Sequence, residues 1–210
     1  MVYFLLCSTS YMRLFVALDI EGKIRAGIHG FMQEMAPLAP NVRWVNPESL
    51  HVTLKFMGEQ PEPKVKEIES ALTSICAFPF QLAFHGSGFF PTPRSARVFW
   101  IGIESGPELA QLASAIDAAL SQLGIEKEKR AFSAHLTLAR AKGGSGAPSR
   151  QKSDRSSRHF EAVQKKLAST PSAEFGTMTA REFFLYRSQL SRHGSRYSKI
   201  ARFPLAAREA

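Results

Sequence analysis

Two short segments of the chain carry the same pattern of reactive side chains. Residues 51–54 read His-Val-Thr-Leu, and residues 135–138, which begin 84 positions later, read His-Leu-Thr-Leu. Successive side chains of a β-strand point to opposite faces, so the histidine and threonine of each segment share one face and the aliphatic residues share the other. The residues whose side chains could take part in a reaction are His51, Thr53, His135 and Thr137.

Two imidazoles and two hydroxyls suit a reaction at a phosphodiester. If two related halves of the chain pack about a pseudo-two-fold axis, the two polar faces meet in one cleft. Displacement at phosphorus needs a base for the attacking oxygen and an acid for the leaving oxygen, and histidine can fill either role near neutral pH. Threonine hydroxyls can donate hydrogen bonds to the non-bridging oxygens. This chemistry requires no metal and no cofactor.

Three other interpretations of the histidines are weaker. A single His-x-Thr is short and common, so each histidine alone could be a polar residue on a half-buried strand; its recurrence in two strand-like settings argues against this. A catalytic zinc usually has three protein ligands, and no third ligand stands at a suitable spacing. A serine nucleophile would need a Gly-x-Ser-x-Gly turn, which the sequence lacks.

The elements that must position these motifs mix strands and helices without regular alternation. Apolar residues recur at helical spacing in several segments, whereas runs rich in β-formers lie in others. Neighbouring strands with short connections favour antiparallel pairing, so the expected fold class is α+β. The expected strands are 14–19, one that begins near 51, 80–90, 96–103, 135–140, 174–178, 181–188 and 197–204; the expected helices are about 20–36, 65–75, 109–123 and 156–168.

The positive charge of the chain is concentrated near its C-terminal end. The formal net charge is +9; residues 1–140 hold 13 basic and 13 acidic side chains, and residues 141–210 hold 14 and 5. One basic side suits a polyanion such as RNA, although a solvated basic surface has the same composition. Cys7 and Cys76 cannot form a disulfide scaffold, and no apolar run approaches the ~20 residues of a membrane span. We therefore expect a cytoplasmic protein that does not insert into membranes.

Longer stretches around both motifs resemble a known family. Residues 44–59, Trp-Val-Asn-Pro-Glu-Ser-Leu-His-Val-Thr-Leu-Lys-Phe-Met-Gly-Glu, resemble the first signature of the bacterial RNA 2′,3′-cyclic phosphodiesterases. These proteins, long called 2′-5′ RNA ligases, belong to the two-histidine phosphodiesterase superfamily. Residues 130–140, Arg-Ala-Phe-Ser-Ala-His-Leu-Thr-Leu-Ala-Arg, resemble the second signature. With weaker similarity elsewhere, the resemblance spans about residues 12–205.

The resemblance implies a fold and an activity. The fold would be bilobal, with two pseudo-symmetric antiparallel-sheet lobes, helices outside and a central cleft, in a single domain over residues 12–205 that follows an extension at 1–11. Water would open a terminal 2′,3′-cyclic phosphate of RNA and leave a 2′-phosphate. His51 would donate a proton to the leaving 3′ oxygen, His135 would accept the proton of water, and Thr53 and Thr137 would hold the phosphate. We expect a monomer with no cofactor.

The sequence leaves other substrates and other site residues open. The same two histidines could support ATP-independent 2′-5′ joining of RNA, or hydrolysis of 2′-5′ linkages or small cyclic nucleotides, and a binding module for RNA without catalysis is the non-enzymatic alternative. Arg130 is expected to bind phosphate, and Phe56 and Phe132 are expected to stack on a base. Ala134 replaces the usual proline before the second histidine. The basic segment 141–158 is longer than usual and is expected to be a flexible loop.

Overall fold

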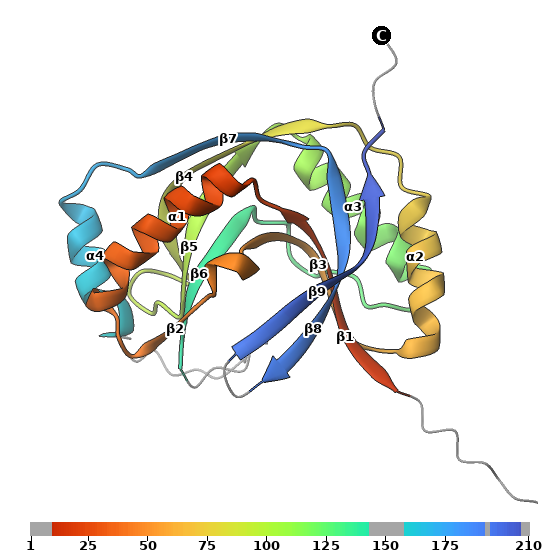
Figure 1. Cartoon of the computed structure of the whole chain (residues 1–210), viewed down its shortest axis with the longest axis horizontal. Coiled ribbons are helices and arrows are strands. Elements are labelled where there is room, and N and C mark those ends of the chain that lie inside the picture. Colours follow the sequence, from red (N-terminus) through yellow and green to blue (C-terminus); the bar gives the residue numbers. More distant parts are fainter. Residues whose placement is uncertain (1–9, 143–157, 192–193, 207–210) are drawn as a thin grey trace, which may run out of the picture.

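Two antiparallel sheets and four α-helices make up the described part of this computed structural model, which comprises residues 10–142, 158–191 and 194–206 (Figure 1). One sheet has the strand order β3 (His51–Pro61), β1 (Tyr11–Asp19), β8 (Glu182–Ser191) and β9 (Gly194–Pro204). The other has the order β2 (Val42–Trp44), β6 (His135–Ala141), β5 (Val98–Ser105), β4 (Phe80–Phe90) and β7 (Glu174–Ala180). The helices are α1 (Gly22–Met35), α2 (Val65–Thr73), α3 (Glu108–Ser121) and α4 (Glu161–Ala168).

Strand β1 shows how one sheet supplies both a core and a site. Leu14, Val16 and Leu18 are fully buried and join the main apolar core. The alternate residues Phe15 and Ala17 are buried on the opposite face, in a small cluster with aromatic side chains of β8. Because β1 lies between β3 and β8, an apolar surface lies next to the first residue of β3, which is His51.

The helices connect the two sheets into one structure. Helix α1 follows a strand of the four-stranded sheet, yet it packs against β7 of the five-stranded sheet. Helix α3 follows β5 of the five-stranded sheet, yet it packs against β3 of the other. In Figure 1, α1 and α4 lie on one side of the molecule, and α2 and α3 lie on the other. The apolar core accordingly contains residues of both sheets and of all four helices of the described chain.

The expected fold class is confirmed: the described chain is α+β, with two antiparallel sheets and helices outside them. The short strand β2 was not predicted, because three residues show no alternation and their extended shape depends on pairing with β6. Residues 1–9 and 143–157, which include most of the expected extension and most of the expected flexible loop, lie outside the described residues. No helix of the described chain has the length and apolarity that a bilayer span needs.

Candidate active site

His51 is the first residue of β3, and the backbone just before it orients the ring. Its Nδ1 lies 2.7 Å from the carbonyl oxygen of Ser49. A carbonyl oxygen can only accept, so Nδ1 carries the hydrogen and donates it. The Ser49 carbonyl belongs to a short 3₁₀ turn over Pro47–Ser49. Consequently Nε2 of the neutral ring is a free base, and it becomes a donor when the ring is protonated.

His135 repeats this arrangement in the other sheet. It is the first residue of β6, and its Nδ1 donates a hydrogen bond of 2.7 Å to the carbonyl oxygen of Ser133, again two residues earlier. Its Nε2 is therefore also free to exchange a proton. The two motifs that the sequence analysis selected share one tautomer, one local geometry and one position at the start of a strand.

Aromatic rings surround both imidazoles. The centroid of the His51 ring lies 4.8 Å from that of Phe15 on β1, 5.2 Å from that of Tyr197 on β9 and 6.1 Å from that of Tyr186 on β8. The His135 ring has two such neighbours: the centroid distances are 4.9 Å to Phe90 on β4 and 6.5 Å to Trp100 on β5. Each histidine is thus partly removed from water by the neighbouring strands of its own sheet.

This burial makes both histidines weaker bases. Burial lowers the pKa of His51 from 6.5 to about 4, although the hydrogen bond to Ser49 and the charge of Asp19 oppose the shift. Burial also lowers the pKa of His135, and the hydrogen bond to Ser133 again opposes it. In the free protein both imidazoles are therefore neutral at pH 7.

Arg140 connects the two motifs electrostatically. Its positive charge lowers the pKa of His51 and the pKa of His135, so one guanidinium on β6 is within electrostatic range of both imidazoles. The strands β3 and β6, which carry the two motifs, contact each other across the sheets. Tyr197 of β9 lies close enough to Arg140 to affect the pKa of the guanidinium. A bound anion beside Arg140 would therefore act electrostatically on both histidines.

The two threonines differ in their contacts. Thr53 is exposed and is two residues from His51 on the same strand, so both side chains face the same side. Thr137 is partly buried, and its Oγ1 accepts a long hydrogen bond of 3.4 Å from Nη2 of Arg140. Both hydroxyls are therefore placed on the histidine face of their strands.

Comparisons with known proteins agree with this geometry. The model of the family "LigT like Phosphoesterase" matches residues 18–100 and again residues 101–197, so each match contains one of the two motifs. The chain belongs to the LigT-like phosphoesterase family. An Archaeoglobus fulgidus protein named RNA 2′,3′-cyclic phosphodiesterase is 36% identical over 192 residues, which are 91% of this chain and 99% of that protein.

Solved structures show the same similarity. The crystal structure of E. coli LigT complexed with 3′-AMP has a TM-score of 0.72 at 26% identity, and the match covers 93% of this chain and 99% of that chain. The crystal structure of a Thermus thermophilus protein has a TM-score of 0.74 at 26% identity, with 94% of this chain and 100% of that chain covered.

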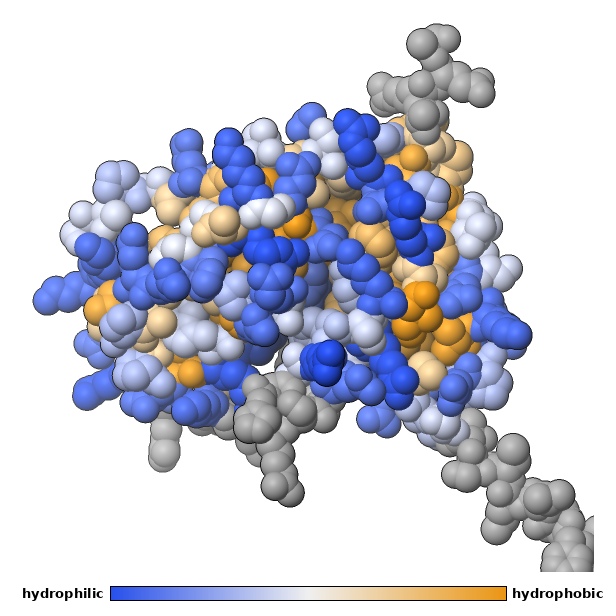
Figure 2. Space-filling view, viewed as in Figure 1, coloured by the Kyte–Doolittle hydropathy of each residue, from blue (hydrophilic) through white to orange (hydrophobic). Residues whose placement is uncertain are grey.

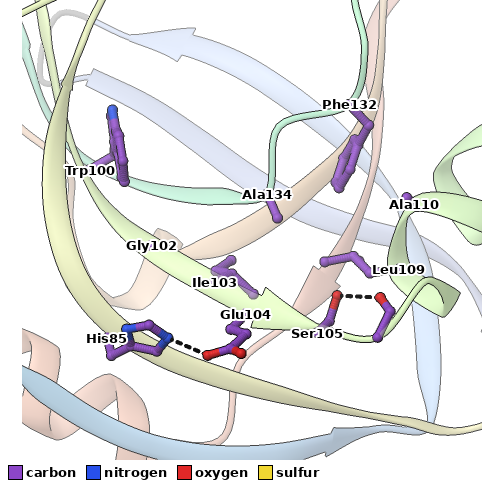
Figure 3. Close-up of a pocket in the computed structure, with 11 residues that line it drawn as sticks. His85, Trp100, Gly102, Ile103, Glu104, Ser105, Leu109, Ala110, Phe132 and Ala134 are labelled. Atoms are coloured by element: carbon purple, nitrogen blue, oxygen red, sulfur yellow. Dashed lines mark hydrogen bonds and ion pairs between the residues drawn. The ribbon is translucent and has the colours of Figure 1, made fainter.

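Of the other predicted site residues of this LigT-like phosphoesterase, Phe132 lies in the lining of a cavity. Phe132 and Ala134 line a cavity of about 500 Å³ together with Trp100 (Figure 3). Phe56 is 44% exposed, and the guanidinium of Arg13 lies 4.9 Å from its ring centroid. Arg130 is exposed, and the described residues provide it with no hydrogen bond or ion pair. Its role in binding phosphate stays a prediction.

Arg140 was not predicted as a site residue from the sequence. Its place in the stretch 130–140 that resembles the second family signature was the available signal, whereas its distance of five residues from His135 would place it on the opposite face of a regular strand. The pairing of β6 with β5 is irregular between the two residues, and the sequence does not show this. The aromatic neighbours had no such signal, because Phe15, Tyr186 and Tyr197 come from three strands that only the folded sheet brings to His51.

One partly buried and one buried basic residue fix the segments that precede the histidines. Before His51, Arg25 of α1 donates to the carbonyl oxygen of Pro47 at 2.7 Å and to Oδ1 of Asp19 at 2.6 Å. Before His135, Lys55 of β3 donates to the carbonyl oxygen of Glu126 and to Oδ1 of Asp117, each at 2.6 Å. Lys55 is only 2% exposed, so these contacts tie the strand of the first motif to the segment that leads to the second.

The face of the molecule shown in Figure 2 is hydrophilic over much of its middle. Strand β9 contributes exposed basic side chains to the four-stranded sheet: Arg196, Lys199 and Arg202. Lys199 also donates to Oδ2 of Asp19 at 2.6 Å, and its ammonium lies 3.9 Å from the ring centroid of Phe184. The basic C-terminal part of the sequence therefore lies partly on the sheet that carries His51.

Proposed function

We propose that this protein hydrolyses the 2′,3′-cyclic phosphate at the end of an RNA and leaves a 2′-phosphate. The observation that carries the proposal is the pair of imidazoles with free Nε2 atoms that share the electrostatic field of Arg140. The name of the Archaeoglobus fulgidus relative supports it. Membership of the bacterial branch is part of the proposal, because the matched relatives come from archaea as well as bacteria. A monomeric state and a cytoplasmic location stay predictions.

The reaction is an in-line displacement at phosphorus. A water oxygen forms a bond to phosphorus while His135 Nε2 takes a proton from that water. The bond from phosphorus to the 3′ oxygen breaks on the opposite side, and protonated His51 donates its Nε2 proton to that oxygen. Thr53, Thr137 and Arg140 donate hydrogen bonds to the non-bridging oxygens, whose charge they stabilise. The phosphate keeps its bond to the 2′ oxygen, and one proton has passed from His51 to the product while another has passed from water to His135.

Because the pKa of His51 is low, His51 must become protonated when the substrate binds. At pH 7 the free protein holds a neutral His51, which cannot donate to a leaving oxygen. The anionic phosphate binds beside Arg140 and offsets the field that lowers the pKa of both histidines. Substrate binding therefore raises both pKa values, and the complex takes up a proton that the free protein does not hold.

The decisive experiment follows the product and the two histidines together. An oligonucleotide with a 2′,3′-cyclic phosphate end is treated with the protein, and phosphorus NMR identifies the phosphate that forms. We expect a 2′-phosphate, a loss of at least ~10²-fold in kcat/KM for His51→Ala and for His135→Ala, and unchanged turnover in EDTA. His29→Ala is the matched control, since His29 is exposed on α1. A 3′-phosphate product, or two fully active histidine variants, would contradict the proposal.

The roles of acid and base can be separated with a modified leaving group. A cyclic substrate with sulfur in place of the leaving 3′ oxygen expels a thiolate, which needs no protonation. His51→Ala should recover most of its lost rate on this substrate, because His51 is the proposed acid. His135→Ala should not recover, because water still needs a base. Recovery of the His135 variant alone would reverse the two assignments.

A further inference from the structure

A cavity of about 500 Å³ opens beside His135, and the mechanism above does not use it. Gly102 of its lining faces His135 directly in the pairing of β5 with β6, and Ala134 of its lining immediately precedes His135. Its volume is in the usual range of small-molecule sites, ≈ 300–1,000 Å³. A group bound there would therefore lie next to the start of β6, where His135 stands.

Two aromatic side chains and one glycine shape the cavity. In Figure 3 the Trp100 indole and the Phe132 ring lie on opposite sides of Ala134. Between Trp100 and Glu104 on the same face of β5 stands Gly102, which has no side chain to cover the sheet. A Cβ atom at this position would lie only 2.7 Å from the carbonyl oxygen of His85, so the tight pairing with β4 requires glycine. The cavity lining thus includes two aromatic side chains, the kind of surface on which nucleobases stack.

One end of the cavity carries a hydrogen-bond acceptor. Glu104 Oε2 lies 2.9 Å from Nε2 of His85, and both side chains line the cavity (Figure 3). Within the described residues, no hydrogen bond reaches the second carboxylate oxygen. An ionised carboxylate only accepts hydrogen bonds, and its two oxygens provide about four acceptor positions. The contact with His85 therefore fixes the orientation of the carboxylate and leaves acceptor positions for a ligand.

The chemistry of a carboxylate distinguishes the four RNA bases. Guanine presents two adjacent N–H donors, N1–H and the 2-amino group, which a carboxylate can accept together. Adenine and cytosine each present an amino group next to an acceptor nitrogen, and the N3–H of uracil lies between two carbonyl oxygens. Only guanine therefore offers the carboxylate two donors without a repulsive neighbour.

We propose that this cavity binds the base of the nucleotide whose phosphate lies between the histidines, and that Glu104 gives it a preference for guanine. The proposal rests on the proposed function for the position of the phosphate. Trp100 and Phe132 provide aromatic surfaces in the cavity on which any base can stack. Glu104 supplies the selectivity, and His85 holds its carboxylate in place.

The test measures binding of products, so that it needs no turnover. Isothermal titration calorimetry at pH 7 compares guanosine, inosine and adenosine 2′-monophosphates on the wild-type protein and on Glu104→Gln. We expect guanosine 2′-monophosphate to bind about tenfold more tightly than the adenosine compound, the discrimination typical of a bidentate contact to a base. Inosine, which lacks the 2-amino group, should fall between them. Glu104→Gln should bring the guanosine and adenosine affinities close together.

Control variants separate selectivity from general effects. Glu67→Gln makes the same charge change on an exposed position of α2 and should keep the guanine preference. Phe132→Ala should weaken all three nucleotides by a similar factor. Equal affinities in the wild-type protein, a preference for adenine, or a guanine preference that survives in Glu104→Gln would each overturn the proposal. Guanine-selective binding without hydrolysis of cyclic ends would refute the proposed function and support the base site. Hydrolysis of cyclic ends with no base preference in binding would support the proposed function and refute the base site.

Discussion

The pH dependence of catalysis directly tests how the fold determines the pKa values of the two catalytic histidines. Turnover needs one imidazole neutral and the other charged. In the free protein burial brings the pKa of His51 from 6.5 to about 4 and lowers the pKa of His135, so this combination is most populated below pH 6.5. We therefore expect kcat/KM to follow a bell with its acid limb near pH 4 and to fall about tenfold between pH 6.5 and pH 7.5. The sequence alone predicts a bell near neutral pH.

The complex should behave differently from the free protein. Because bound phosphate offsets the field of Arg140, the bell for kcat should lie at higher pH than the bell for kcat/KM. The assay is a set of initial-rate curves on a cyclic-phosphate oligonucleotide from pH 3.5 to pH 8.5 at constant ionic strength. A kcat/KM optimum at or above pH 7, or coincident bells, would refute the reasoning from burial and charge.

Substitution of Arg140 tests the electrostatic contribution to the two pKa shifts, which is smaller than that of burial. Arg140→Gln removes a charge that lowers both histidine pKa values, so the optimum of kcat/KM should move to higher pH while its maximal value falls. Arg43→Gln is the matched control, since Arg43 faces Arg140 in the pairing of β2 with β6 and does not contribute to either histidine pKa shift. It should leave the optimum in place. An optimum that stays fixed in Arg140→Gln would contradict the assigned role of that charge.

Three further predictions concern stability. Between pH 6.5 and pH 4 the unfolded chain binds a proton at His51 and the folded protein does not, so the free energy of unfolding rises with pH in this window. Lowering the pH from 7 to 4 should therefore remove about 3 kcal/mol of stability from the wild-type protein that His51→Gln does not lose. Equal acid sensitivity of the two proteins in urea unfolding would count against this prediction. Lys55→Met should lower the free energy of unfolding by about 1–3 kcal/mol, because the Asp117 carboxylate and the Glu126 carbonyl lose the Lys55 ammonium, although Asp117 keeps the N–H of Glu128. Lys129→Met, at an exposed pair, should have little effect. Gly102→Ala should lower the free energy of unfolding by about 1–3 kcal/mol, since the new Cβ would meet the backbone of β4. Gly22→Ala is the control and should be tolerated, because open space surrounds Gly22. A fully stable Gly102→Ala would show that the strands can separate.

Much of the site could be predicted from the sequence because the relevant pattern is local. The side chains of a strand alternate with a period of two, so the placement of His51 with Thr53, and of His135 with Thr137, follows from four residues in each case. The strands around them are long enough to show their β-forming composition, and the antiparallel α+β class follows from their order. The three-residue strand β2 is too short for such a pattern.

The remaining features depend on contacts between distant parts of the chain. Both Arg130 and Arg140 are exposed, and only the folded structure shows that the charge of Arg140 acts on both histidines. The position of Phe132 in the lining of the cavity likewise depends on how β5 and the segment before β6 meet. The low pKa of His51 depends on aromatic rings from β1, β8 and β9. Alternation along a strand is set by the covalent backbone, and so the sequence alone determines it; burial and electrostatic field are sums over neighbours that only the packed tertiary structure brings together.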